Sequence, residues 1–105
     1  MALGFGRRKK PGETAGDEVF PALSSVEPRR HVRVKGQIFK LRTRPRQGMP
    51  SLEVTLIDDS GSVTVVWSGR RSIGGVGLGR RIIIEGVATK GPHGLTFTNP
   101  AYELL

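Results

Sequence analysis

The stretch from Leu52 to Trp67 constrains the fold more than any other part of this 105-residue chain. Apolar and polar residues alternate on both sides of Asp58–Gly61, whose Asp-Asp-Ser-Gly composition is typical of a turn. Alternation places every second side chain on the same side of a strand, so the two runs predict a β-hairpin with one buried face. The residues expected on that face are Leu52, Val54, Leu56, Val63, Val65 and Trp67.

Alternation also begins at His31 and continues to about Phe39, which predicts a strand before the hairpin. Gly36 lies in the middle of this strand and indicates a bulge or a sharp bend, a device by which one long strand serves both halves of a small barrel. The two prolines and the glycine of residues 42–50 then predict a long connecting loop.

Two more strands are expected after the hairpin. Residues 68–79 are rich in glycine and predict an irregular connector or a short helix. A strand at about 81–88 has apolar residues on both faces, and a Gly-bounded turn separates it from a strand at 95–98. Residues 101–105 are expected to close the chain as an apolar cap. The predicted fold class is therefore all-β, a five-stranded Greek-key barrel over residues 29–105.

Residues 1–28 show neither strand nor helix periodicity. They mix Gly, Pro, Ser and charged residues, which is typical of a flexible arm. Residues 17–23 could form a short helical turn that docks on the domain, with Pro21 and Pro28 limiting its length. The basic run Arg7–Lys10 has two interpretations, a non-specific phosphate contact or a solvated tail.

Charge and cysteine content narrow the function classes. Lys and Arg total 17 against 9 acids, a formal net charge of +8, so a polyanion is the expected partner unless the cations only solubilise the surface. Residues 31–105 hold eleven of these cations and five acids. Without cysteine there is no disulfide, thiolate metal site or cysteine nucleophile. No apolar run is long enough to span a membrane, so we expect a soluble, cytoplasmic protein.

The strand order and turn lengths match the OB-fold plan, and several short motifs resemble a particular branch of that family. The resemblance is to the wedge domain of RecG-like fork-remodelling helicases and to small stand-alone actinobacterial OB-fold proteins. It implies nucleic-acid binding and a possible protein partner in DNA replication or repair, without the helicase motor. The residues that carry it are Val32–Gly36, Leu52–Leu56, Asp59–Val63, Trp67–Arg71, Gly79–Arg81 and Asn99–Leu104.

In the OB-fold plan, a ligand lies across the second and third strands, between the loops that join strands one and two and strands four and five. Arg42, Arg44 and Arg46 stand at alternate positions of the first loop and would point the same way if that loop is extended, or else form a solvated, mobile loop. Lys90 and His93 lie in the second loop, on the opposite wall. The exposed side of strand one adds Arg33, Lys35 and Lys40.

Aromatic platforms for base stacking are scarce. Phe39 and Trp67 are the candidates, although Trp67 shares its face with core residues and is more consistent with packing than with stacking. Binding should therefore be chiefly electrostatic. Arg70 and Arg71, with Arg80–Arg81, predict either a second basic patch or a solvated barrel rim.

No catalytic or metal-binding constellation stands out. His31 and His93 are far apart in sequence, and Asp58 and Asp59 are explained by the turn. We therefore predict a non-enzymatic nucleic-acid-binding protein without cofactor or metal, with single-stranded DNA favoured over RNA. The alternatives are an RNA-binding OB protein and a protein-interaction module that docks on an acidic partner.

Overall fold

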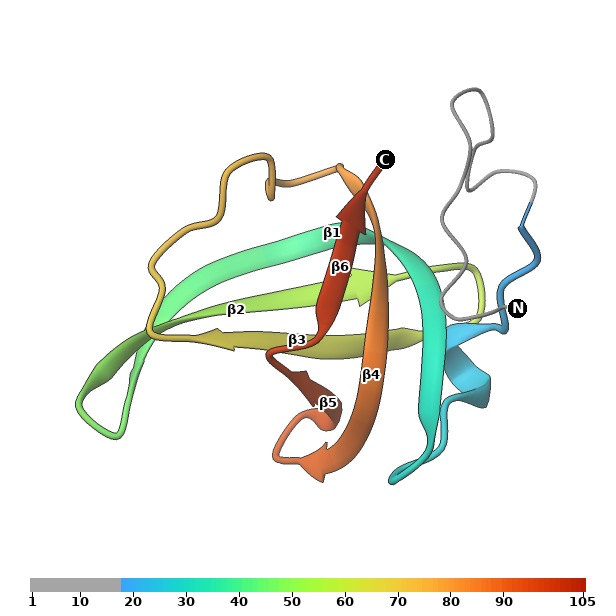
Figure 1. Ribbon diagram of the computed structural model, residues 1–105, viewed down its shortest axis with the longest axis horizontal. Helices are drawn as coiled ribbons and strands as arrows, with labels where there is room; N and C mark the ends of the chain where they lie inside the picture. The colour runs from blue at the N-terminus through green and yellow to red at the C-terminus, as the bar shows by residue number, and fades with distance from the viewer. Residues whose placement is uncertain (1–17) are drawn as a thin grey trace, which may run out of the picture.

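The computed structural model describes residues 18–105, and these form a small barrel (Figure 1). A 3-10 turn, η2, precedes the first strand. The flexible arm was predicted over residues 1–28, and its residues 1–17, which include the basic run, lie outside the described residues. The elements are η2 (Leu23–Ser25), β1 (His31–Arg46), β2 (Met49–Ile57), β3 (Ser62–Ser68), β4 (Arg81–Gly91), β5 (Gly94–Thr98) and β6 (Ala101–Leu104).

Five strands form a closed ring. The order is β1, β2, β3, β5, β4, and β4 pairs again with β1. The β3–β5 pairing is parallel, whereas the other pairings in the ring are antiparallel. The prediction of an all-β, five-stranded Greek-key barrel is confirmed.

The closure of the ring depends on the bent strand β1, which pairs with two partners. Its first half, from His31 to Gln37, pairs with β4, and its second half, from Gln37 to Arg46, pairs with β2. Gly36 lies where β1 passes from one partner to the other, and a Cβ there would stand 3.1 Å from the Leu56 Cβ. The bend was expected at Gly36, whereas the bulge itself lies at Phe39, between the register pairs of Ile38 and Lys40.

The predicted long loop over residues 42–50 is wrong, because β1 and β2 continue as a hairpin to a two-residue turn. Gln47 and Gly48 form this turn with φ angles of 52° and 80°, the positive values that a type I′ turn requires at both positions. Pro45 pairs with Pro50, and this pair lies one residue further from the turn than the pair that flanks it. In such a hairpin that position is a non-hydrogen-bonded pair, so neither proline removes a ladder hydrogen bond.

The two alternating runs of the central hairpin bury the face predicted for them. Val54, Leu56 and Val65 are fully buried, and Trp67 is 5% exposed. Two other segments complete the core: Leu23 and Val26 come from the N-terminal segment, and Ile73 comes from the β3–β4 connection. A short helical turn was expected at residues 17–23. The structure has no helix at residues 18–22, and the 3-10 turn η2 that contacts the barrel begins only at Leu23.

The β2–β3 turn is held by the carboxylate of Asp58. Its Oδ1 accepts hydrogen bonds from the backbone N–H groups of Ser60 and Gly61 and from the Ser60 hydroxyl, at 2.6–3.0 Å. Its Oδ2 accepts from the backbone N–H of Leu23 at 2.9 Å. Burial raises the pKa of Asp58, but these hydrogen bonds stabilise the charged form and lower its pKa overall. One side chain thus joins the turn to the η2 segment.

The C-terminal segment is a sixth strand, where the sequence suggested only an apolar cap. β6 pairs with Ile82–Glu85 of β4, which are four of the seven β4 residues that pair with β1. Since a strand has two edges, β1 and β6 lie on opposite edges of β4, and Figure 1 shows β6 beside β4.

Replacing Gly36 with Ala should destabilise the barrel by about 1–2 kcal/mol, because the new Cβ meets the Leu56 Cβ and the Ile57 carbonyl at 3.1 and 3.2 Å. Neither neighbour can move without moving backbone. Urea denaturation measures the change. Gly74→Ala is the matched control, since a Cβ there meets nothing within 4 Å, and its stability should change by less than about 0.5 kcal/mol. Equal effects of the two substitutions would contradict the close approach at Gly36.

Asp58→Asn should lower the free energy of unfolding by about 1 kcal/mol at neutral pH, since the charged acceptor is lost. The lowered pKa of Asp58 means that its contribution is complete above the unfolded-state pKa of about 3.9 and disappears as pH falls through the folded-state pKa. The difference between wild type and variant should therefore shrink on acidification, as measured by urea denaturation across pH. Asp59→Asn, which changes an exposed neighbour, is the control.

Candidate nucleic-acid interface

A groove crosses the outer surface of β2, β3 and β5. It consists of three adjoining cavities of about 330, 270 and 180 Å³. The largest lies between the end of the β1–β2 hairpin, at Arg44–Arg46, and the β4–β5 hairpin, at Lys90–His93. Its floor includes Ser51, Glu53, Thr64, Thr96 and Thr98, and its extension adds Lys40, Arg42 and Thr55.

The bulge at Phe39 brings the cations of β1 to this groove. Before the bulge, even-numbered residues such as Val34 and Ile38 point inward and are buried. The extra residue reverses this alternation, so the even-numbered residues after it point outward. These are Lys40, Arg42, Arg44 and Arg46, all exposed.

The register of the strands arranges the groove in three rows of paired residues. Residues directly opposite one another on neighbouring strands share a face of the sheet. Each row begins with a cation from β1, and the first and third rows continue across the strands with hydroxyl-bearing side chains. The rows are Lys40–Thr55–Thr64–Thr96–Thr89, Arg42–Glu53–Val66–Thr98 and Arg44–Ser51–Ser68.

The hydroxyl-bearing side chains on the floor of the groove were not predicted from the sequence. The alternating pattern did indicate their outward direction, because Thr55, Thr64 and Thr96 each occupy polar positions of alternating strands. What the sequence could not supply was the register that aligns them, including the parallel Thr64–Thr96 pair. Thr64 is 8% exposed, so the row forms the bottom of the groove.

Lys90 and His93 form the opposite wall, as expected. Lys90 pairs with Leu95 near the end of β4, and His93 lies in the turn between Gly91 and Gly94. Both line the largest cavity, together with Arg44 and Arg46. The structure therefore brings together five of the predicted cations: Lys40, Arg42, Arg44, Arg46 and Lys90.

Trp67 does not belong to this interface, and its assignment as a stacking residue is corrected. Its side chain lies in the core, and its Nε1–H donates to the Pro100 carbonyl oxygen at 3.3 Å. The ring contacts the Tyr102 ring edge-on, with centroids 5.5 Å apart. Among residues 18–105, no Phe, Tyr or Trp lines the groove.

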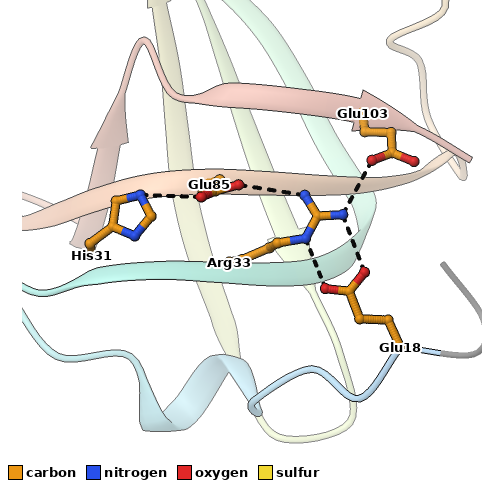
Figure 2. A network of polar contacts seen from close by, with 5 residues as sticks. All are labelled: Glu18, His31, Arg33, Glu85 and Glu103. Atoms are coloured by element: carbon orange, nitrogen blue, oxygen red, sulfur yellow. Dashed lines mark hydrogen bonds and ion pairs between the residues drawn. The ribbon is translucent and has the colours of Figure 1, made fainter. Parts of the chain in front are cut away.

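The assignment of Arg33 to the interface is also corrected. Arg33 is the centre of an ion-pair network away from the groove (Figure 2). Its guanidinium contacts Glu18 at 2.8 Å, Glu103 at 3.2 Å and Glu85 at 3.6 Å. Glu85 also contacts His31 at 3.3 Å. The hydrogen bond to Glu18 raises the pKa of Arg33 more than burial lowers it, and Glu103 raises it further.

Lys35 lies on the same outer surface of β1 as Arg33. Its Nζ stands 5.3 Å from the centre of the Phe20 ring, over which the Arg33 guanidinium also lies, at 5.9 Å. Lys35 therefore contacts the N-terminal segment and does not line the groove. The sequence predicted that Arg33 and Lys35 bind nucleic acid, because charge and alternation do not show that carboxylates surround Arg33 or that Phe20 packs beside Lys35.

Three other predicted residues do not line the groove. Phe39 is 60% exposed at the bulge, adjacent to Lys40. Arg70 and Arg71 are exposed in the β3–β4 connection, where the Arg71 carbonyl oxygen accepts a hydrogen bond from Thr43. Thr43 alternates with Arg42 and Arg44 and so points to the other face of β1.

Arg80, which the sequence grouped with Arg70 and Arg71, donates a hydrogen bond to the Leu105 carbonyl oxygen at 3.0 Å.

A closed ring of this strand order, with a polar groove over β2, β3 and β5, defines an OB barrel. Residues 32–105 match the family model "tRNA_anti-codon", described as an OB-fold nucleic acid binding domain, and the chain belongs to this family. No match is found among curated proteins.

Two negative findings concern the described part of the chain. Within residues 18–105, no group of three or more His, Cys, Asp or Glu side chains is placed to hold a metal ion. The same residues contain no helix long and apolar enough to cross a membrane.

Replacing Arg33 with Ala should destabilise the protein by about 1–2 kcal/mol, because three carboxylates then face one another without their shared cation. Chemical denaturation measures this loss. Arg30→Ala is the control, since the Arg30–Glu27 pair is exposed and should contribute less than about 0.5 kcal/mol. Affinity for oligonucleotides should change by less than about twofold in both variants. A larger loss of affinity in the Arg33 variant alone would indicate that Arg33 contacts the nucleic acid.

Proposed function

We propose that this protein is a non-enzymatic binder of single-stranded nucleic acid, with the strand lying in the groove. The observation that carries the proposal is the three parallel rows, each with a cation from β1 at its end. In this arrangement Lys40, Arg42, Arg44 and Arg46 contact phosphates from one side, and Lys90 contacts them from the other.

The spacing of the cations supports a single strand as the ligand. Alternate residues of a β-strand are about 6.5 Å apart, which is close to the separation of successive phosphates in an extended single strand. The floor offers hydroxyl groups, which donate to phosphate or sugar oxygens. Because no Phe, Tyr or Trp in the described chain lines the groove, stacking contributes little and the binding free energy is mainly electrostatic.

Single-stranded DNA is the expected ligand. This choice follows the resemblance of residues 32–105 to wedge domains of fork-remodelling helicases, which act on DNA. The groove itself contacts backbone, which DNA and RNA share, so RNA is the alternative that a paired titration decides.

Fluorescence anisotropy with labelled single-stranded DNA, single-stranded RNA and duplex DNA of matched length tests the proposal. If four phosphates are neutralised, affinity for single strands should fall about 50-fold between about 50 and 200 mM salt. Replacing Arg42, Arg44 and Arg46 together with Ala should weaken binding and reduce the salt dependence, because only Lys40 and Lys90 of the five groove cations remain.

The matched control removes the same charge elsewhere. Arg70, Arg71 and Arg81 are exposed and do not line the groove, so their triple Ala variant should retain most of the affinity. Equal losses of affinity in the two triple variants would indicate attraction by net charge alone and would contradict binding in the groove. Absence of binding by folded wild-type protein would overturn the proposal and favour a protein-docking module.

A further inference from the structure

The second row of the groove contains a carboxylate, Glu53, among the cations. Its side chain is 21% exposed and lines both of the larger cavities. Among residues 18–105 it is the one acidic residue that lines the groove. A negative charge at this point opposes phosphate binding, so simple electrostatic affinity does not explain its presence in the middle of the floor.

The contacts of Glu53 leave part of the carboxylate available. Its Oε1 lies 3.1 Å from the Arg44 Nε and 3.8 Å from the Arg42 Nε. Within the described part of the chain, neither oxygen of the Glu53 carboxylate accepts a hydrogen bond from a protein group. A carboxylate can accept about four hydrogen bonds, so Glu53 retains acceptor capacity on the groove side.

The two arginines fix where this capacity lies. Arg42 stands directly opposite Glu53 in the β1–β2 register, and Arg44 lies two residues further along β1. Together they hold the carboxylate and place guanidinium donors next to it. The groove therefore presents an anionic acceptor beside cationic donors, a pattern that a phosphate cannot satisfy and a nucleobase can.

Among the bases, guanine complements this pattern best. Its Watson–Crick edge carries two adjacent donors, N1–H and the 2-amino group, beside the O6 acceptor. The donors suit the carboxylate oxygens, and O6 suits a neighbouring guanidinium. Unstacked bases of single strands expose this edge, which is how single strands are read in sequence-specific complexes.

We propose that Glu53, positioned by Arg42 and Arg44, is a base-reading residue that selects guanine within the bound single strand. This inference rests on the proposed function of the groove, because it requires a strand whose backbone follows the cations. It adds a specificity that backbone contacts cannot provide.

Anisotropy titrations with three labelled oligonucleotides test the inference: a thymidine homopolymer, the same oligomer with one central guanine, and the same oligomer with hypoxanthine at that position. Hypoxanthine lacks only the 2-amino group, so it removes one donor and keeps the purine ring, N1–H and O6. Wild-type protein should bind the guanine oligomer at least about fivefold more tightly than either of the others.

Glu53→Gln should abolish this preference, because the amide replaces an anionic acceptor with a mixed donor and acceptor. It should also bind the thymidine and hypoxanthine oligomers more tightly than wild type, since a negative charge leaves the groove. Glu27→Gln is the matched control, because it removes the same charge at an exposed site outside the groove, and it should keep the guanine preference.

The outcomes separate the two proposals. Salt-dependent binding of all three oligomers with equal affinity by wild type would overturn base reading by Glu53 while leaving the groove intact. A guanine preference that persists in Glu53→Gln would assign the selection to another residue and would also overturn the inference. Failure of the wild type to bind any oligomer would overturn the proposed function and the inference with it.

Discussion

The pairing of β1 with two partners is the constraint on which the rest of the structure depends. One strand must leave β4 and join β2 without breaking its own hydrogen-bonded ladders, and it does so by passing its neighbours closely at Gly36 and adding one residue at Phe39. The bend closes the ring and permits a core in which Val34, Val54 and Ile84 are fully buried. Without it, the sheet would remain open and would expose its edges.

The same bulge links the fold to the interface. Because it reverses the alternation of β1, the strand presents Arg33 and Lys35 outward on one side of the barrel and Lys40, Arg42 and Arg44 outward over the groove. The two sets then have different neighbours. Arg33 is surrounded by three carboxylates, whereas Arg42 and Arg44 share one, so the groove keeps a net positive charge. Equal formal charges along one strand thus have different roles, one in stability and one in recognition.

Local patterns predicted much of the barrel and part of the site. The alternation of residues 52–67 and the Asp58 turn were sufficient for the central hairpin, because period-two burial and turn chemistry are short-range properties. The alternate spacing of Arg42, Arg44 and Arg46 likewise placed them on one face. The extended β1–β2 hairpin was missed because prolines normally end strands, and their cost disappears only when they pair at a non-hydrogen-bonded position, as Pro45 and Pro50 do.

By itself, the sequence determined which residues alternate, where the chain turns and how much positive charge it carries, because these follow from neighbours a few residues apart. Only the tertiary structure decided how those local pieces combine. The parallel β3–β5 register aligns Thr64 with Thr96 to form the floor, and the acids Glu18, Glu85 and Glu103 gather around Arg33. Each depends on contacts between segments distant in the chain, whose geometry is set by closure of the barrel and leaves no signal in local periodicity.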